Sequence, residues 1–260
     1  MTETIGIAPD DYDASHTAFH DSALMRRLYA EGMGDQYPAE VEPFSSCTWW
    51  LLGQLVSVLR LQPDDLLVDL GCGRAGPGLW LARALSARLI GVDFSPAAVE
   101  LATRRVAAFV APGRAAFRVA SFDQTGLPDA GAAAVISIDA LPFAKDRPAA
   151  LREVHRILTP GGRCALTVRS RPGVAGKDWL AMARAAGLTV EETLPNPYHD
   201  EHWQRLYAVW LANANQLRAE LGERAANNLL AEARDGQARQ WDGLPPPLLL
   251  VLCRPEHGAA

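Results

Sequence analysis

The glycines of one short segment have the spacing of loops that bind nucleotides. Gly71, Gly73 and Gly76 follow the pattern G-x-G-x-x-G, and Asp93 comes about twenty residues further on. Glycine lets the backbone approach a ligand closely, and an acidic side chain at that distance can accept hydrogen bonds from ribose hydroxyls. The pattern therefore predicts a ligand with an adenosine part, but several nucleotide ligands share these features.

Three further residues indicate which of the possible adenosine-containing ligands is bound. Asp69 lies just before the glycine loop, where it would repel a pyrophosphate but attract a ligand with an ammonium and a sulfonium group. Phe94 follows Asp93 and can lie against an adenine ring. Asp123 lies in a loop after a short apolar segment and can accept a hydrogen bond from the adenine amino group. Together these residues favour S-adenosylmethionine over a dinucleotide.

The elements that must carry these side chains alternate between strand and helix. This alternation from residue 66 onward predicts an α/β fold with a doubly wound, mostly parallel sheet, and ligands bind at the carboxyl ends of such strands. A helix should begin at Ser95–Pro96. Another should cover 147–158 and stop at Thr159–Gly162. The predicted strands are 66–70, 88–92, 117–120, 133–138, 164–168, 188–192 and 248–253, with further helices at 76–85 and 179–186.

Helical patterns flank this core on both sides. Residues 46–59 have apolar positions at helical spacing, and the segment 195–247 contains a stretch, 202–233, that is mostly helical in pattern. Because the second segment leaves the carboxyl end of a strand, it is placed to cover a bound ligand as a lid, although simple packing would also explain it. We expect one compact domain with an N-terminal helical cap (1–60), a cofactor-binding α/β core (61–194), a helical lid insertion (195–247) and a last strand with a tail (248–260).

The composition excludes several classes of function. The 260 residues are 49% hydrophobic, which is enough for one well-buried core. The net charge is −5 without a basic stripe, which argues against a nucleic-acid partner, and no apolar run is long enough to span a membrane. The four cysteines lack metal or redox spacing, and the acidic residues 1–13 lack the apolar region of a signal peptide. We expect a cytoplasmic monomer or homodimer that binds a small molecule.

Five ordered segments resemble the Rossmann-like, class I methyltransferases that depend on S-adenosylmethionine. The matching segments are 68–73, 91–96, 123–128, 134–141 and 158–163. Their order and spacing are similar to those of the family over about 63–169, and the flanks resemble small-molecule methyltransferases of bacterial metabolism, especially natural-product tailoring enzymes. The resemblance implies seven strands with the last one antiparallel, S-adenosylmethionine as cofactor, and methylation of a small-molecule acceptor.

The resemblance also implies individual contacts with the cofactor. Gly71 and Gly73 would lie under its methionine part, and Asp93 would hold the ribose. Many relatives have an acidic residue or a glycine where this chain has Ser121–Phe122, which leaves the adenine-side contacts open. The full set of residues implied to bind the cofactor is Asp69, Gly71, Cys72, Gly73, Asp93, Phe94, Ser121, Phe122, Asp123 and Ile138.

Methyl transfer from a sulfonium is an in-line displacement, so the protein must mainly align the reacting atoms. A general base is needed only when the acceptor carries a proton, as in a phenol, a hydroxyl or an ammonium. Asp139 ends the fourth predicted strand, where it could act as a base or contact the cofactor instead. The other candidate bases are His199, His202 and Asp200 where the lid begins, and His16 and His20, which could equally be a surface pair. No metal site is expected, because Asp139 lacks an adjacent acidic or amide partner.

Four aromatic residues are candidates for an acceptor pocket, although amphipathic packing would explain them equally well. They are Tyr37, Trp49, Trp203 and Tyr207. Two other functions share part of the sequence pattern. An NAD-type oxidoreductase would have the glycines and Asp93, but it would not account for Asp69 or Asp123. A non-methylating member of the same fold, such as a cyclase or a binding module, would keep the cofactor pocket and differ in its loops and lid.

Overall fold

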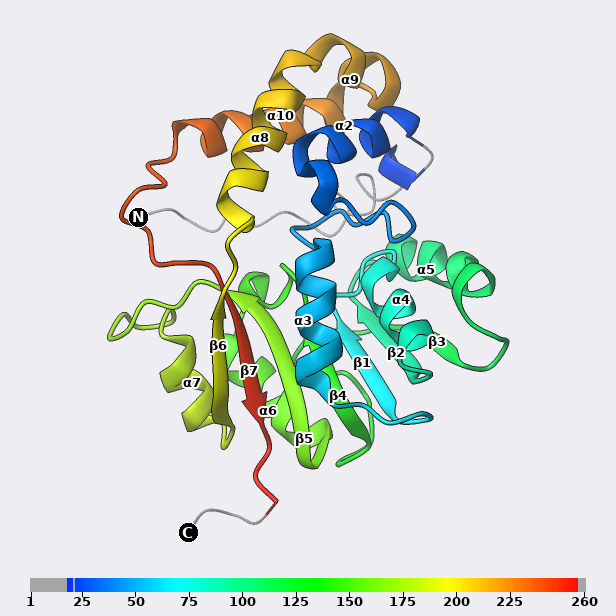
Figure 1. Cartoon of the computed structure of the whole chain (residues 1–260), viewed down its shortest axis with the longest axis vertical. Helices are drawn as coiled ribbons and strands as arrows, with labels where there is room; N and C mark the ends of the chain where they lie inside the picture. The colour runs from blue at the N-terminus through cyan, green and yellow to red at the C-terminus, as the bar shows by residue number, and fades with distance from the viewer. Residues whose placement is uncertain (1–17, 21, 257–260) are drawn as a thin grey trace.

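One mixed sheet organises the molecule (Figure 1). In residues 18–20 and 22–256, which the computed structural model describes, seven strands have the order β3-β2-β1-β4-β5-β7-β6. Strands β1 to β5 pair in parallel, and β7 is antiparallel to both of its neighbours. The predicted seven-stranded sheet with an antiparallel last strand is confirmed. The strands are β1 (Leu66–Leu70), β2 (Arg88–Asp93), β3 (Ala115–Val119), β4 (Ala132–Ser137), β5 (Leu158–Val168), β6 (Thr189–Pro195) and β7 (Leu248–Cys253).

Helices cover both faces of the sheet. Successive residues of a strand point to opposite faces, and in β1 Leu67 packs in one core cluster while Val68 packs in the other. The first cluster includes residues of α3 (Trp49–Leu59) and α4 (Gly76–Ala84), with α5 (Pro96–Phe109) alongside. The second includes residues of α6 (Arg147–Ile157) and α7 (Trp179–Ala185). The sheet is thus doubly wound, as the alternating pattern predicts.

A helical layer lies above the carboxyl ends of the parallel strands (Figure 1). It consists of α2 (Ala23–Met33), the short turn η1 (Gly34–Gln36), α8 (His199–Ala212), α9 (Ala214–Leu221) and α10 (Glu223–Ala238). Their buried side chains, including Leu28, Leu206 and Trp210, form a third cluster. Helices α2 and α8 touch at Gly32, where an added Cβ would lie 3.0 Å from a methyl carbon of Leu206. Segments from the two ends of the sequence therefore build one layer.

Local signals place several element boundaries correctly. Ser95 caps α5 by accepting a hydrogen bond from the amide of Ala98, and Pro96 occupies the first turn. The helix predicted from residue 46 begins instead at Trp49, because the Thr48 side chain caps it. Strand β6 begins at Thr189 and continues to Pro195, three residues beyond its predicted end. These differences leave the order of the elements unchanged.

The prediction that Thr159–Gly162 separates a helix from a strand starting at residue 164 is wrong. Strand β5 already begins at Leu158, which pairs with Ala132. The next pair along the two strands is Ala134 with Arg163, so the glycine-containing stretch bulges within β5. Contacts with the other end of the chain hold this bulge, since the amide of Gly161 donates to the Arg254 carbonyl at 2.8 Å.

The composition also predicts the state of the cysteines and the absence of a membrane-spanning segment. All four cysteines are free and buried, as expected for the core positions Cys164 and Cys253. Within the described ranges, no helix combines the length and apolar character needed to cross a membrane. The acidic start of the chain at 1–13 lies outside the described residues.

Candidate functional site

The glycine loop lies between the carboxyl end of β1 and the start of α4. Gly71 and Gly73 have φ angles of 73° and 51°, in the left-handed region that favours glycine. A Cβ added to Gly71 would lie only 2.3 Å from the Cβ of Ala140, so that position has no room for a side chain. The amides of Gly71 and Cys72 both donate to the carbonyl of Val92, at 2.7 and 3.1 Å. The loop is therefore fixed to the end of β2.

A buried carboxylate stands beside this loop. Asp93 is 6% exposed, and its two oxygens accept hydrogen bonds from the amides of Gly73 (2.8 Å) and Ser95 (3.0 Å). Each carboxylate oxygen has a second lone pair that can accept from a ligand hydroxyl. The next residue, Phe94, presents an exposed aromatic ring. A fixed carboxylate next to an exposed ring suits a ribose and an adenine.

Asp69 does not face the ligand side of the glycine loop, although the sequence suggests that it does. It is buried, and its carboxylate faces the first turn of α4, where a Cβ on Gly78 would lie 2.5 Å from Oδ2. Burial and the nearby charge of Asp93 raise the pKa of Asp69 to about 7, although a hydrogen bond from the Gly78 backbone opposes this. Its negative charge is thus partly lost at neutral pH, which weakens the argument from charge against a pyrophosphate.

The loop after β3 brings one aromatic ring to the glycine loop. Phe122 is half-buried, and a Cβ added to Gly71 would lie 3.1 Å from its Cε1 atom. Ser121 and Asp123 on either side are exposed. The sequence-predicted adenine-side residues therefore divide into one ring packed on the loop and two polar residues at its rim.

Both carboxylate oxygens of Asp139 are occupied by protein donors. Oδ2 accepts from the amide of Ser46 at 2.6 Å, and Oδ1 accepts from the hydroxyl of Thr167 at 2.8 Å. The residue has a φ of 52° just beyond the end of β4, and the preceding Ile138 is buried in the core. Asp139 thus joins β4, β5 and the segment before α3 through its two carboxylate oxygens.

A histidine–carboxylate pair marks the start of α8. Nδ1 of His199 lies 2.8 Å from Oδ1 of Asp200, and Asp200 also forms an ion pair with Arg169, just past the end of β5. Burial alone would raise the pKa of Asp200, but the hydrogen bond with His199 and the charge of Arg169 hold it below its ordinary value. In the tautomer with a proton on Nδ1, the carboxylate orients the ring and Nε2 can accept a proton.

His202 lies one turn further along α8 and is 3% exposed. Within the described residues, neither ring nitrogen makes a hydrogen bond of normal geometry. Burial, reinforced by the charge of His199, lowers the pKa of His202 to about 4. The residue lines a cavity of about 300 Å³, together with Gly32, Gln36, Tyr198 and Arg205 among others. It is thus a neutral imidazole at ordinary pH.

The aromatic candidates do not all gather in one place. Trp203 and Tyr207 of α8 are in contact through tilted rings with centroids 5.4 Å apart, and the ring centroid of Trp210 lies 6.3 Å from that of Trp203. Trp49 instead packs on Trp80, 5.7 Å away, and is 37% exposed. Tyr37 is half-buried in the turn after α2, where burial raises its pKa to about 12. The structure therefore brings Trp203 and Tyr207 into contact and packs Tyr37 against the same cluster, whereas Trp49 lies elsewhere.

Arg74 was missed by the sequence reasoning. Arg74 is buried, with 5% of its surface exposed. Its guanidinium lies 3.8 Å from the centroid of the Phe44 ring and donates to the carbonyl of Glu42 at 3.0 Å. The same side chain contacts His20, whereas His16 lies outside the described residues. Arg74 thus ties the glycine loop to the segment before α3. In the part of the chain that the structure describes, no group of His, Cys, Asp and Glu could hold a metal ion.

The chain is similar to known methyltransferases over its central part. A family model described as "Methyltransferase domain" matches residues 68–166. The 27-O-demethylrifamycin SV methyltransferase of Amycolatopsis mediterranei is 30% identical over 184 residues, which is 70% of this chain and 63% of that protein. Methyltransferase GfsG of Streptomyces halstedii is 28% identical, over 57% of this chain and 55% of that protein. The matched region thus spans less than two thirds of the length of either relative.

Solved structures share the same fold. The [4+2]-cyclase SpnF has a TM-score of 0.69 at 20% identity, covering 80% of this chain and 81% of the cyclase. A methyltransferase from Geobacter sulfurreducens, solved with S-adenosyl-L-homocysteine, has a TM-score of 0.64 at 19% identity, covering 88% of this chain and 98% of that one. At these identities the likeness establishes the fold.

Proposed function

Through residues 68–166 the chain belongs to the class I methyltransferases that depend on S-adenosylmethionine, and we propose that it methylates a small-molecule acceptor. One observation carries this proposal: the buried carboxylate of Asp93 is fixed against the glycine loop and next to the exposed ring of Phe94. This arrangement offers hydrogen-bond acceptors for a ribose and an apolar face for an adenine. The bound cofactor would supply an activated methyl group on its sulfonium.

The residues around the loop fit such a cofactor. Gly71 and Gly73 would lie under its methionine part, since both have φ angles in the left-handed region and a side chain at Gly71 would collide with Ala140. Asp93 would accept hydrogen bonds from the ribose hydroxyls, and Phe94 would pack on the adenine. Asp123 at the rim would accept from the adenine amino group. Cys72 and Ile138 would add buried surface beside the pocket.

The helical layer would form the roof of the acceptor site. Helices α2, α8 and α10 lie above the carboxyl ends of β1, β4 and β5, the edge at which ligands bind in open parallel sheets (Figure 1). Trp203, which is half-buried and packs on the buried Tyr207, would give this layer an aromatic face for a flat or apolar molecule. The similarity to the 27-O-demethylrifamycin SV methyltransferase of Amycolatopsis mediterranei supports a bacterial secondary metabolite as the acceptor.

His199 is the best placed candidate for a general base. Asp200 holds its Nδ1, and Arg169 holds Asp200, so the imidazole has a fixed orientation at the end of β5. Nε2 would accept the proton of an acceptor hydroxyl, and the adjacent carboxylate would stabilise the resulting imidazolium. His202 is a weaker candidate, because burial lowers its pKa to about 4 and the imidazole is therefore a weak base.

Product analysis tests the proposal. The purified chain is incubated with S-adenosylmethionine and a panel of hydroxylated aromatic and macrocyclic compounds, and both products are followed by mass spectrometry. The expected result is S-adenosylhomocysteine together with an acceptor in which a methyl group replaces a hydrogen. An acceptor that rearranges without a change of mass, and without S-adenosylhomocysteine, would instead identify the non-methylating alternative.

A further inference from the structure

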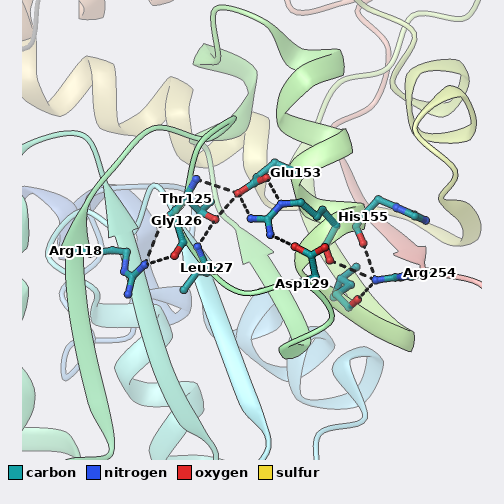
Figure 2. A network of polar contacts seen from close by, with 10 residues as sticks. Arg118, Thr125, Gly126, Leu127, Asp129, Glu153, His155 and Arg254 are labelled. Carbon is teal, nitrogen blue, oxygen red and sulfur yellow. Dashed lines mark hydrogen bonds and ion pairs between the residues drawn. The ribbon is translucent and has the colours of Figure 1, made fainter.

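Side chains from two different elements hold the loop between β3 and β4 (Figure 2). Glu153 of α6 accepts hydrogen bonds from both the amide and the hydroxyl of Thr125, with 3.0 Å between Oε1 and the amide nitrogen. Arg118 of β3 donates to the carbonyls of Thr125 at 3.3 Å and of Gly126 at 2.8 Å. Both backbone polar groups of Thr125 are therefore fixed by side chains.

Glu153 is itself held in one orientation. Arg156 donates to both of its carboxylate oxygens, at 2.8 and 2.7 Å, and also pairs with Asp129. Glu153 is 8% exposed, and burial alone would raise its pKa, but the hydrogen bonds from Arg156 and Thr125 lower it instead. The carboxylate is thus ionised, and hydrogen bonds to an ionised group are stronger than neutral ones.

The clamped loop also carries Phe122, which faces the glycine loop, and the exposed Asp123. Both lie directly before the clamp, and an antiparallel bridge between Ser121 and Gln124 closes the turn. The ring of Phe122 packs against Gly71, where an added Cβ would lie 3.1 Å from Cε1. The orientation of this ring and of the Asp123 carboxylate therefore depends on where Thr125 is held.

We propose that Glu153 is a positioning residue for the adenine end of the cofactor site. It acts through Thr125, which keeps Phe122 against the glycine loop and Asp123 at the rim. The inference rests on the proposed function, because it takes Asp123 to be the residue that accepts from the adenine amino group. Loosening the clamp should therefore weaken cofactor binding and, in particular, the preference for a 6-amino group on the purine.

A second ion pair in the same fold provides a matched control. Arg163 of β5 donates to both oxygens of Glu191 on β6, at 2.7 and 3.0 Å. This pair has the same two-point geometry as Glu153 with Arg156, but it joins β5 to the edge strand β6, at the opposite edge of the sheet from β3 and the clamped loop that follows it. Glu191→Gln thus tests the loss of an ion pair without the loss of the clamp.

The experiment measures binding by isothermal titration calorimetry with two ligands. S-adenosylhomocysteine carries the 6-amino group, and S-inosylhomocysteine has an oxygen in its place. Thr125→Val and Glu153→Gln should each reduce the preference for the amino compound by about tenfold, the effect expected when a hydrogen bond to a charged group is lost. Thr125→Ser keeps the hydroxyl, so both it and Glu191→Gln should keep the preference within about twofold of the wild type.

The outcomes distinguish a failure of the proposed function from a failure of the role proposed for Glu153. If the wild-type chain binds neither ligand, the proposed function fails. If the wild type prefers the amino compound but Thr125→Val and Glu153→Gln keep that preference while only their melting temperatures fall, the clamp merely supports the fold and the inference is overturned. Should Glu153→Gln not fold, Thr125→Val decides alone, because it leaves the Glu153–Arg156 pair in place.

Discussion

The carboxylate of Asp93 accepts a hydrogen bond from the backbone amide of Gly73, with 2.8 Å between Oδ2 and the nitrogen. This bond joins the end of β2 to the loop after β1. The other oxygen accepts from Ser95, which caps the following helix. The group that would hold the ribose is therefore also a brace for the glycine loop, so its two roles must be separated by experiment.

Asp93→Ala should weaken binding of S-adenosylhomocysteine by about 100-fold, which corresponds to ~2.7 kcal/mol. The variant loses both the acceptor for the ribose hydroxyls and the brace of the loop. Calorimetric titration measures the affinity, and circular dichroism checks that the fold is intact. An affinity within about threefold of the wild type, a change below ~1 kcal/mol, would show that Asp93 is not the ribose partner.

Gly71→Ala should abolish measurable cofactor binding. An added Cβ would meet the Cβ of Ala140 at 2.3 Å, and the φ of 73° adds strain of about 1 kcal/mol or more. Gly173→Ala is the matched control, since Gly173 has the same φ of 73° but no atom within 4 Å of an added Cβ. If both variants bind S-adenosylhomocysteine like the wild type, the tight approach at Gly71 has no part in cofactor binding.

His202 should make the free energy of unfolding depend on pH. Its pKa is about 4 in the folded chain against an ordinary 6.5, so between these values the unfolded state binds more protons. Stability is then lost as the pH falls from about 6.5 to about 4, by at most ~3 kcal/mol. His202→Phe should remove this part of the acid loss in urea titrations. If the free energy of unfolding fell with pH by the same amount in the wild type and in the variant, the assignment to His202 would be contradicted.

Asp69 should have the opposite effect. Its pKa is about 7 in the folded chain against an ordinary 3.8, so here the folded state binds more protons. Its contribution to stability is present below pH 3.8 and is lost as the pH rises to about 7, by at most ~4 kcal/mol. Asp69→Asn should therefore gain stability relative to wild type over that range. A constant difference between the two chains would contradict the raised pKa.

His199→Gln should lower kcat for a hydroxyl acceptor by about 100-fold, a usual loss for a general base. Asp200→Asn should have a smaller effect, because the imidazole remains but loses its orienting carboxylate. Neither change should alter the affinity for S-adenosylhomocysteine by more than about twofold. If kcat stays near the wild-type value in both variants, the acceptor loses its proton without help from this pair.

The sequence predicts the elements of this fold where the signals are local. Strands β1 and β7 have their predicted bounds, and Ser95–Pro96 starts α5, because apolar runs and capping residues act on their own neighbours. The start of β5 was missed, because it depends on pairing of Leu158 with Ala132 and on contacts of Gly161 with Arg254. No pattern in residues 158–163 contains that information.

The same distinction applies to the site. Gly71 and Asp93 could be recognised because their spacing along the chain reflects one strand, one helix and the next strand. The clamp of Thr125 by Glu153 could not, since the partners are 28 residues apart and a buried glutamate on a helix looks like a surface residue in the sequence. Likewise, His199–Asp200 is visible as a pair, whereas Arg169 joins it only through the meeting of β5 and α8.

Calorimetric titration of the wild-type chain with S-adenosylhomocysteine, and separately with NAD, tests the central claim most directly. The account predicts saturable binding of S-adenosylhomocysteine to one site per chain, with a Kd on the order of micromolar (about −8 kcal/mol), and no heat of binding with NAD. Binding of NAD without binding of S-adenosylhomocysteine would contradict it, and would assign the loop around Gly71 and Asp93 to a dinucleotide.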